Sequence, residues 1–233
     1  GRSVVARHVG AADVLSAPSR YGVDPSLVRD GANEVRIVRR GTGALYFSAE
    51  ARFYSQEEPI APAGNELFAR REYYKLVGRA TLLKGYVYDR VPLRDGETVK
   101  SGERVQTVLT IEAKNDYEYL LLEDNKPAGF EAVEVRSGEP LYARQLKAGA
   151  VAEGRTGDAT DYAEGTAWVY EELRDRKVAL FVSKLPQGVW EIRYEMRAEV
   201  PGTFHALPVV GQAMYVPEIR CNGAETRVTV GER

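Results

Sequence analysis

The sequence has few of the residues that most often build reactive centres. Its 233 residues include one cysteine, Cys221, and two histidines, His8 and His205. A single cysteine cannot form a disulfide within the chain, and the redox compartment stays open because secreted proteins can also lack disulfides. Zinc sites use three or four Cys, His or carboxylate ligands, often at short spacing. The three residues lie in different segments, so we expect no metal and no other cofactor.

The sequence also lacks an excess of charge and any long apolar run. It has 32 Lys and Arg against 34 Asp and Glu, so nucleic acid is not an expected partner, because that binding depends on concentrated positive charge. No apolar run reaches the roughly 18 residues of a membrane span, so we expect no direct membrane insertion. Residues 1–5 have neither an initiator Met nor the layout of a signal peptide, and we expect a piece of a longer protein.

Strand-like alternation is the strongest pattern in the chain. From Trp190 to Val200, apolar residues alternate with charged ones, which places the apolar side chains on one face of a strand. Similar alternation runs from Val105 to Ala113 and from Leu45 to Phe53. Weaker strands are expected at 34–39, 117–122, 130–135, 178–182 and 227–230. Short strands separated by turn residues, without long amphipathic helices, predict an all-β fold, specifically an antiparallel β-sandwich.

Three segments depart from this pattern. Asp24 and Pro25 provide the cap and the first-position proline of one helical turn. The stretch 139–164 has no clear period, so we expect a long loop with a short helix near Leu141–Leu146. The polar stretch 57–65 contains two prolines and predicts a boundary between a piece of about 60 residues, small for an independent core, and a larger domain.

The residues alone do not indicate an enzyme. Cys221 precedes Asn222-Gly223, a turn signal, and is expected to be a partly exposed turn cysteine, since a cysteine nucleophile needs a neighbouring base. The adjacent carboxylates Glu171 and Glu172 would point to opposite faces of a strand. Tyr is frequent, with 14 against six Phe and two Trp, which is compatible with sugar or peptide binding but also with ordinary packing of a half-buried sheet.

Several stretches, in their order, carry a family resemblance. The first runs from Asp24 to Ile37 and continues at Gly43–Ala49. Later ones are 71–74, 101–105, 123–130, 174–176, 197–204 and 214–217. The first stretch resembles the complement-type β-domain that follows the thioester domain in bacterial alpha-2-macroglobulin-like proteins. The later ones are similar to the last macroglobulin-like domain of the same family, the counterpart of the animal receptor-binding domain.

This resemblance implies two domains. Residues 1–60 would be the returning half of the β-domain, and residues 66–233 would be an Ig-like, macroglobulin-type β-sandwich. The parent protein would be a protease-trapping endopeptidase inhibitor, located in the periplasm, in the cell envelope or outside the cell. The implied partners are the thioester domain and other domains of the parent chain, and target proteases through the parent.

The resemblance also implies a site. Similar proteins carry a Met-Tyr pair that shields the thioester until the bait region is cleaved, and the matching residues are Met214 and Tyr215. The thioester itself is not expected here, because the family's Cys-x-x-Gln pattern fails at Ala224, the fourth position from Cys221. The residues alone would favour Met214 and Tyr215 as core residues of the last hairpin.

Two other classes of function remain open. One is an Ig-like adhesion or carbohydrate-binding module that uses Trp168 or Trp190 as a platform. Trp190 lies on the apolar face of its strand and is expected in the core, whereas a half-exposed Trp168 beside other aromatic rings would favour this class. The other is a β-sandwich glycoside hydrolase, which would need two carboxyl groups facing each other in a cleft.

Overall fold

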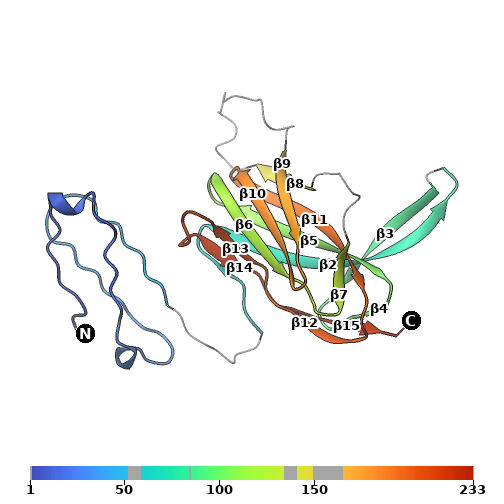
Figure 1. Cartoon of the computed structure of the whole chain (residues 1–233), viewed down its shortest axis with the longest axis horizontal. Coiled ribbons are helices and arrows are strands. Elements are labelled where there is room, and N and C mark those ends of the chain that lie inside the picture. The colour runs from blue at the N-terminus through green and yellow to red at the C-terminus, as the bar shows by residue number, and fades with distance from the viewer. Residues whose placement is uncertain (1, 52–58, 84, 134–140, 149–164, 233) are drawn as a thin grey trace. The chain divides into compact units, whose positions relative to one another are not determined.

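The computed structural model describes residues 2–51, 59–83, 85–133, 141–148 and 165–232 (Figure 1). The chain forms two compact units, Gly1–Glu50 and Ala51–Arg233. No helix in the described ranges is both long and apolar enough to cross a bilayer.

The first unit contains two short 3₁₀ helices, η1 (Ala11–Asp13) and η2 (Pro25–Leu27). In η2 the Asp24 carboxylate accepts a hydrogen bond from the backbone N–H of Ser26 at 2.8 Å. This is the capped helical turn predicted from the sequence, because a side-chain acceptor satisfies an N–H that the turn leaves free.

The strands predicted at 34–39 and 45–53 are wrong where the structure describes them. Residues 34–39 and 45–51 have no strand pairing, and residues 52 and 53 lie outside the described ranges. The alternating apolar residues nevertheless face one another, since Val35 and Ile37 line a shallow groove together with Leu45 and Phe47. All four side chains remain exposed. Two extended segments with an uncovered apolar face are marginal as an isolated hairpin, which explains the missing ladder.

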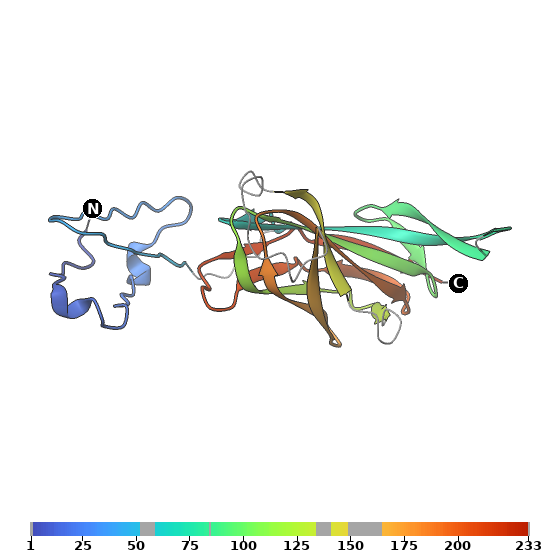
Figure 2. The same cartoon turned by 90° about the horizontal axis from the view of Figure 1, so that it is seen from above.

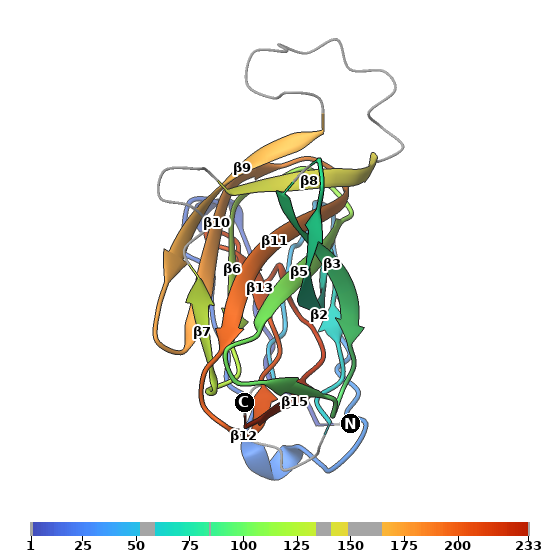
Figure 3. The ribbon, with the colours of Figure 1, turned by 90° about the vertical axis from the view of Figure 1, so that its right-hand side faces the viewer.

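The second unit is built from β-strands (Figures 1 and 3). They are β1 (Ala63–Gly64), β2 (Leu67–Thr81), β3 (Gly85–Leu93), β4 (Thr98–Lys100), β5 (Arg104–Ala113), β6 (Tyr117–Asn125), β7 (Phe130–Val133), β8 (Leu141–Ala148), β9 (Thr166–Leu173), β10 (Lys177–Leu185), β11 (Gly188–Ala198), β12 (Gly202–Ala206), β13 (Val210–Ala213), β14 (Arg220–Asn222) and β15 (Thr226–Gly231). They confirm the predicted all-β antiparallel fold.

A large curled sheet and a small sheet share these strands. The large sheet has twelve strands in the order β1-β14-β13-β6-β10-β9-β8-β11-β5-β2-β3, with β7 paired to β11. The small sheet has the order β12-β15-β4, and its β15–β4 pair is parallel. The large sheet curls so that β6 and β10 face β5 and β11 across the interior (Figure 3).

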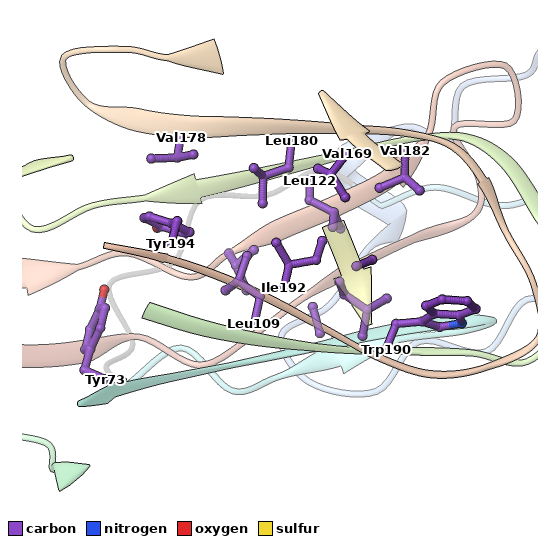
Figure 4. Close-up of a cluster of buried hydrophobic side chains, with 14 of the residues drawn as sticks. Tyr73, Leu109, Leu122, Val169, Val178, Leu180, Val182, Trp190, Ile192 and Tyr194 are labelled. Carbon is purple, nitrogen blue, oxygen red and sulfur yellow. The ribbon is translucent and has the colours of Figure 1, made fainter. Parts of the chain in front are cut away.

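The core follows from the alternation seen in the sequence. In β11 the side chains of Trp190, Ile192, Tyr194 and Met196 are all buried. They meet side chains of β10 and β5, which point into the same interior (Figure 4). The strands predicted at 105–113, 117–122, 178–182 and 227–230 are confirmed, and that at 130–135 is confirmed through Val133.

The helix predicted at Leu141–Leu146 is wrong, because this segment lies in β8. This strand pairs antiparallel with both β9 and β11, and Ala143 is buried in the core. Two neighbouring strands can hydrogen-bond its backbone groups and cover its apolar side. This tertiary pairing outweighs a weak local preference for helix. The rest of the predicted loop, 139–140 and 149–164, lies outside the described residues.

A buried ion pair crosses the interior. The Arg71 guanidinium of β2 lies 2.5 Å from the Asp124 carboxylate of β6, and both side chains are fully buried. Arg71 also donates to the carbonyl oxygens of Ala206 at 2.8 Å and Leu207 at 2.9 Å. The hydroxyl of Tyr194 donates to the other Asp124 oxygen. Burial raises the pKa of Tyr194, so its phenol stays protonated and serves as the donor.

We predict that Arg71→Met lowers the free energy of unfolding by about 3–5 kcal/mol, because it leaves the Asp124 carboxylate buried without its cation. Denaturant unfolding followed by circular dichroism measures the change. The matched control is Arg79→Met, which removes an exposed partner of Asp89 and should leave the transition midpoint unchanged. Equal midpoints for Arg71→Met and the wild type would contradict the prediction.

Candidate functional site

Met214 and Tyr215 lie at the start of the loop between β13 and β14. Their side chains are 47% and 76% exposed. The interpretation of both residues as core residues of the last hairpin is therefore wrong, because the buried positions nearby are Ala213 and Cys221. Two large side chains with apolar surface are available for contact with something outside this unit.

The loop is nevertheless held in place by its backbone. The N–H of Ala213 donates to the carbonyl of Ile219 at 3.0 Å, and that of Ile219 donates to Val216 at 2.9 Å. The Met214 N–H donates to the carbonyl of Tyr119 in β6 at 2.9 Å. These bonds fix the position from which the two side chains project.

Tyr119 is a third member of this site, and no pattern in the sequence singled it out. Its ring meets that of Tyr215 edge to face, with centroids 5.1 Å apart and planes at 85°. This geometry is favourable for aromatic pairs. Its φ is 54°, a left-handed conformation that is uncommon for a bulky residue and is concentrated at functional or strained positions. Among the described residues that are not glycine, it alone has positive φ.

The backbone of β6 shows what this conformation does. In the β6–β10 ladder, the pair of Glu118 with Lys184 is followed directly by the pair of Leu120 with Val182, so Tyr119 has no partner in this ladder. The residue thus interrupts the ladder on the β10 side. We infer that its positive φ turns its carbonyl toward Met214 and its ring toward Tyr215. We name Met214, Tyr215 and Tyr119 the Met-Tyr site.

A second group of aromatic rings lies on β8, β9 and β10, and all of them are exposed except Phe181, which is half-buried. Trp168 is 52% exposed, and its ring centroid is 6.3 Å from that of Tyr170. Tyr170 lies 5.9 Å from Phe181, and Tyr142 is paired with Trp168 across β8 and β9. Trp190 is buried as predicted. The half-exposed Trp168 beside other rings is the arrangement that favours a binding module. We name Trp168, Tyr170, Phe181 and Tyr142 the Trp168 patch.

Metal binding and glycoside hydrolysis each need a particular cluster of side chains. Within the described ranges there is no group of three or more His, Cys, Asp or Glu side chains that could hold a metal ion. A glycoside hydrolase needs two carboxyl groups in one cleft. The groove of the first unit and a closed hollow around Tyr73 and Phe130 are lined without Asp or Glu, so neither supports a glycoside hydrolase.

A known domain family matches most of the second unit. It is described as the bacterial alpha-2-macroglobulin MG10 domain, and the match covers residues 69–218. The chain belongs to this family. The resemblance to bacterial alpha-2-macroglobulin-like proteins is thereby confirmed.

Individual relatives also belong to the alpha-2-macroglobulins. The alpha-2-macroglobulin of Xylella fastidiosa strain Temecula1 is 26% identical over 201 residues, which are 85% of this chain and 11% of that protein. The alpha-2-macroglobulin homolog of a Nostoc species is 23% identical over 203 residues, which are 87% of this chain and 10% of that protein. The crystal structure of native Escherichia coli alpha-2-macroglobulin from domain MG7 to the C-terminus aligns with a TM-score of 0.51 and 25% identity, covering 76% of this chain and 25% of that one. The chain thus spans about a tenth of the length of these curated relatives.

Cys221 of this MG10 chain is not the partly exposed turn cysteine that the sequence predicted. It lies in β14 and is buried, opposite Gly211 of β13. A Cβ at Gly211 would come within 2.9 Å of the Cys221 sulfur, so glycine leaves the room that the thiol occupies. Burial raises the pKa of Cys221 to about 11, which keeps it a thiol and disfavours the reactive thiolate.

We predict that Cys221 does not react with a thiol reagent such as DTNB in the folded chain at pH 8, where only about a thousandth of it would be thiolate. Labelling should become stoichiometric when the chain is unfolded in denaturant. Absorbance of the released thionitrobenzoate gives the measurement, and Cys221→Ser is the blank. Complete labelling of the folded wild type within minutes would contradict the prediction.

Proposed function

We propose that this chain is the C-terminal, non-catalytic part of a protease-trapping alpha-2-macroglobulin. In this proposal Met214 and Tyr215 cover the thioester of the parent protein until a protease cleaves its bait region. The observation that carries the proposal is that both side chains project outward from a loop whose backbone is fixed to β13, β14 and Tyr119.

The chemistry of the Met-Tyr site suits such a cover. A thioester survives only while water and amines are kept away from its carbonyl carbon. A methionine side chain adapts its shape to an irregular surface, and a tyrosine ring excludes water while its hydroxyl can hydrogen-bond. The edge-to-face contact with Tyr119 holds the Tyr215 ring before any partner arrives. A pre-positioned side chain loses less entropy when it binds.

The domain assignment is part of the proposal. We assign residues 66–233 to the last macroglobulin-like domain, which includes the family match at 69–218. Residues 1–60 would be the returning half of the preceding β-domain. The exposed apolar groove of the first unit, formed by Val35, Ile37, Leu45 and Phe47, supports this assignment, because strands from the other half of that domain would cover it.

The partners follow from the same reasoning. The direct partners would be the thioester domain and other domains of the parent chain, and target proteases would be reached through the parent. The proposed location is the periplasm, the cell envelope or the outside of the cell, where a protease trap meets foreign proteases.

We predict that Tyr215→Ala in the full-length parent speeds the release of a free thiol by methylamine about tenfold or more, because an opened cover admits the amine to the thioester. Thiol release is followed with DTNB under native conditions. Cys221 should not contribute to the signal, since its thiol is buried. The matched control is Tyr142→Ala, which removes another half-exposed tyrosine from a different strand.

Tyr119→Ala extends the same experiment. Loss of the supporting ring should speed release less than Tyr215→Ala, and the double variant should not exceed Tyr215→Ala, because both changes open one cover. Equal rates for the wild type and Tyr215→Ala would refute shielding by Tyr215. No release from any variant would mean that the parent has no accessible thioester.

A second candidate function rests on the Trp168 patch. Exposed, neighbouring aromatic rings on a rigid sheet can stack against the apolar faces of sugar rings, and the tyrosine hydroxyls can bond sugar hydroxyls. The pairing of β8 with β9 and of β9 with β10 sets the positions of the four residues. The patch therefore supports a carbohydrate-binding module as the alternative.

If this alternative is correct, affinity electrophoresis in gels with soluble polysaccharides should retard the wild-type chain, and Trp168→Ala should weaken retardation about tenfold or more, the effect of losing an aromatic anchor. Tyr46→Ala, which removes an exposed tyrosine from the first unit, is the control. Unretarded migration of the wild type in every polysaccharide gel would leave the Trp168 patch without a carbohydrate role.

A further inference from the structure

The β2–β3 hairpin extends beyond the sheet that supports its base. β5 pairs with β2 only from Leu67 to Lys75, whereas β2 continues to pair with β3 as far as Thr81 and Gly85. The described residues of 76–90 therefore form a two-stranded projection, which we name the finger (Figures 1 and 2). In Figure 2 it is the pair of teal-green strands that projects beyond the other strands of this unit.

Two apolar side chains near the end of the finger are fully solvent-exposed. Leu82 and Leu83 follow β2 directly, and neither side chain is covered by any other part of the described unit. A hairpin end normally carries polar turn residues. Two adjacent leucines at the outermost point of an isolated hairpin are costly in water unless they enter an apolar environment.

Aromatic rings form the next layer behind the leucines. Tyr86 and Tyr88 lie on one face of β3 with ring centroids 6.2 Å apart, and both are exposed. The Tyr86 ring packs against Gly78 of β2, where an added Cβ would come within 2.5 Å of it. The absence of a side chain at Gly78 therefore lets the tyrosine ring lie along the finger.

Arginine side chains lie among the tyrosines and at the base of the finger, since Arg79 pairs with Val87 and Arg90 pairs with Leu76. Arg79 forms an exposed ion pair with Asp89 at 2.9 Å. Arg104 lies over the Tyr88 ring at 5.4 Å, and Arg90 lies over the Tyr74 ring at 4.2 Å. The described residues of the finger include two basic residues, Arg79 and Arg90, and one acidic residue, Asp89, although the whole chain has a net charge of −2. The finger is thus locally positive in an otherwise slightly negative protein.

We propose that the finger docks on the surface of an anionic phospholipid bilayer. The leucines at the tip, the tyrosines behind them and Arg90 at the base follow the order of acyl chains, interfacial region and phosphates that is passed on moving outward from the core of a membrane. The excess of positive charge complements anionic headgroups. The two leucines enter the acyl region of one leaflet, and the finger does not span the bilayer. This revises the expectation of no direct membrane insertion, which was based on long apolar runs and could not detect a two-residue apolar tip.

The proposal is independent of the Met-Tyr site, and sedimentation with lipid vesicles tests it on the 233-residue chain. We expect the wild type to sediment with vesicles of equimolar phosphatidylcholine and phosphatidylglycerol, and about tenfold more weakly with phosphatidylcholine alone. The double variant Leu82→Ser/Leu83→Ser should lower the bound fraction on the mixed vesicles by about tenfold or more. Leu15→Ser is the matched control, because Leu15 is 98% exposed in the first unit.

A second readout reports on the tip itself. Leu83→Trp should show a blue-shifted emission maximum on the mixed vesicles and quenching by lipids labelled in the acyl chain. No sedimentation of the wild type overturns the proposal and points to a protein partner for the finger. Equal sedimentation of the wild type and the double variant also overturns it, since the leucines would then have no part in binding. Equal binding to neutral and mixed vesicles overturns the role of the anionic headgroups.

Discussion

The arrangement of the second unit depends on the buried ion pair between Arg71 and Asp124. The pair joins β2 to β6 across the interior, and Tyr194 adds β11 through the same carboxylate. Arg71 also binds the carbonyls of Ala206 and Leu207, where the chain leaves the small sheet and heads toward β13. The Arg71 guanidinium therefore sets the position of β2 relative to β6, and also the position of the segment that leads to Met214.

A buried charge pair is more informative about specificity than about stability. Removing the charges from water costs free energy that the attraction between them only partly returns. An apolar core of Leu, Ile and Val could pack in several registers, whereas Arg71 has its acceptors in one register only. We infer that the pair selects the alignment of β2 against β6, and that β6 in turn brings Tyr119 beneath the Met214–Tyr215 loop.

The sequence predicted the parts of the fold whose pattern is local and regular. The alternation of β11 and β5 was sufficient, and so was the cap of Asp24 on its helical turn. β8 was missed because its pairing with β9 and β11 is not visible in its own residues. The strands predicted in the first unit were wrong for the opposite reason. The alternating pattern is present at Val35 and Phe47, but no other segment of the described unit covers their apolar face.

The site was predictable in part. Met214 and Tyr215 were selected by resemblance to a family, and their role as a thioester shield remains a proposal. Their exposure could not be read from the sequence, because a Met-Tyr pair between apolar residues suits a core equally well. Tyr119 gave no signal, since a positive φ at a tyrosine results from its surroundings. Cys221 was expected at the surface because Asn-Gly, a turn signal, follows it. In the structure, Cys221 instead lies within β14 and is buried.

The small sheet has a consequence for how the unit assembles. Its middle strand is β15, so neither β4 nor β12 gains its ladder in this sheet until residues 226–231 are in place. β4 lies early in the unit, and its partner Thr229 is more than half the chain away from Thr98. Contacts at such separation form late and slowly. We infer that, during synthesis, this end of the unit stays open until β15 has left the ribosome.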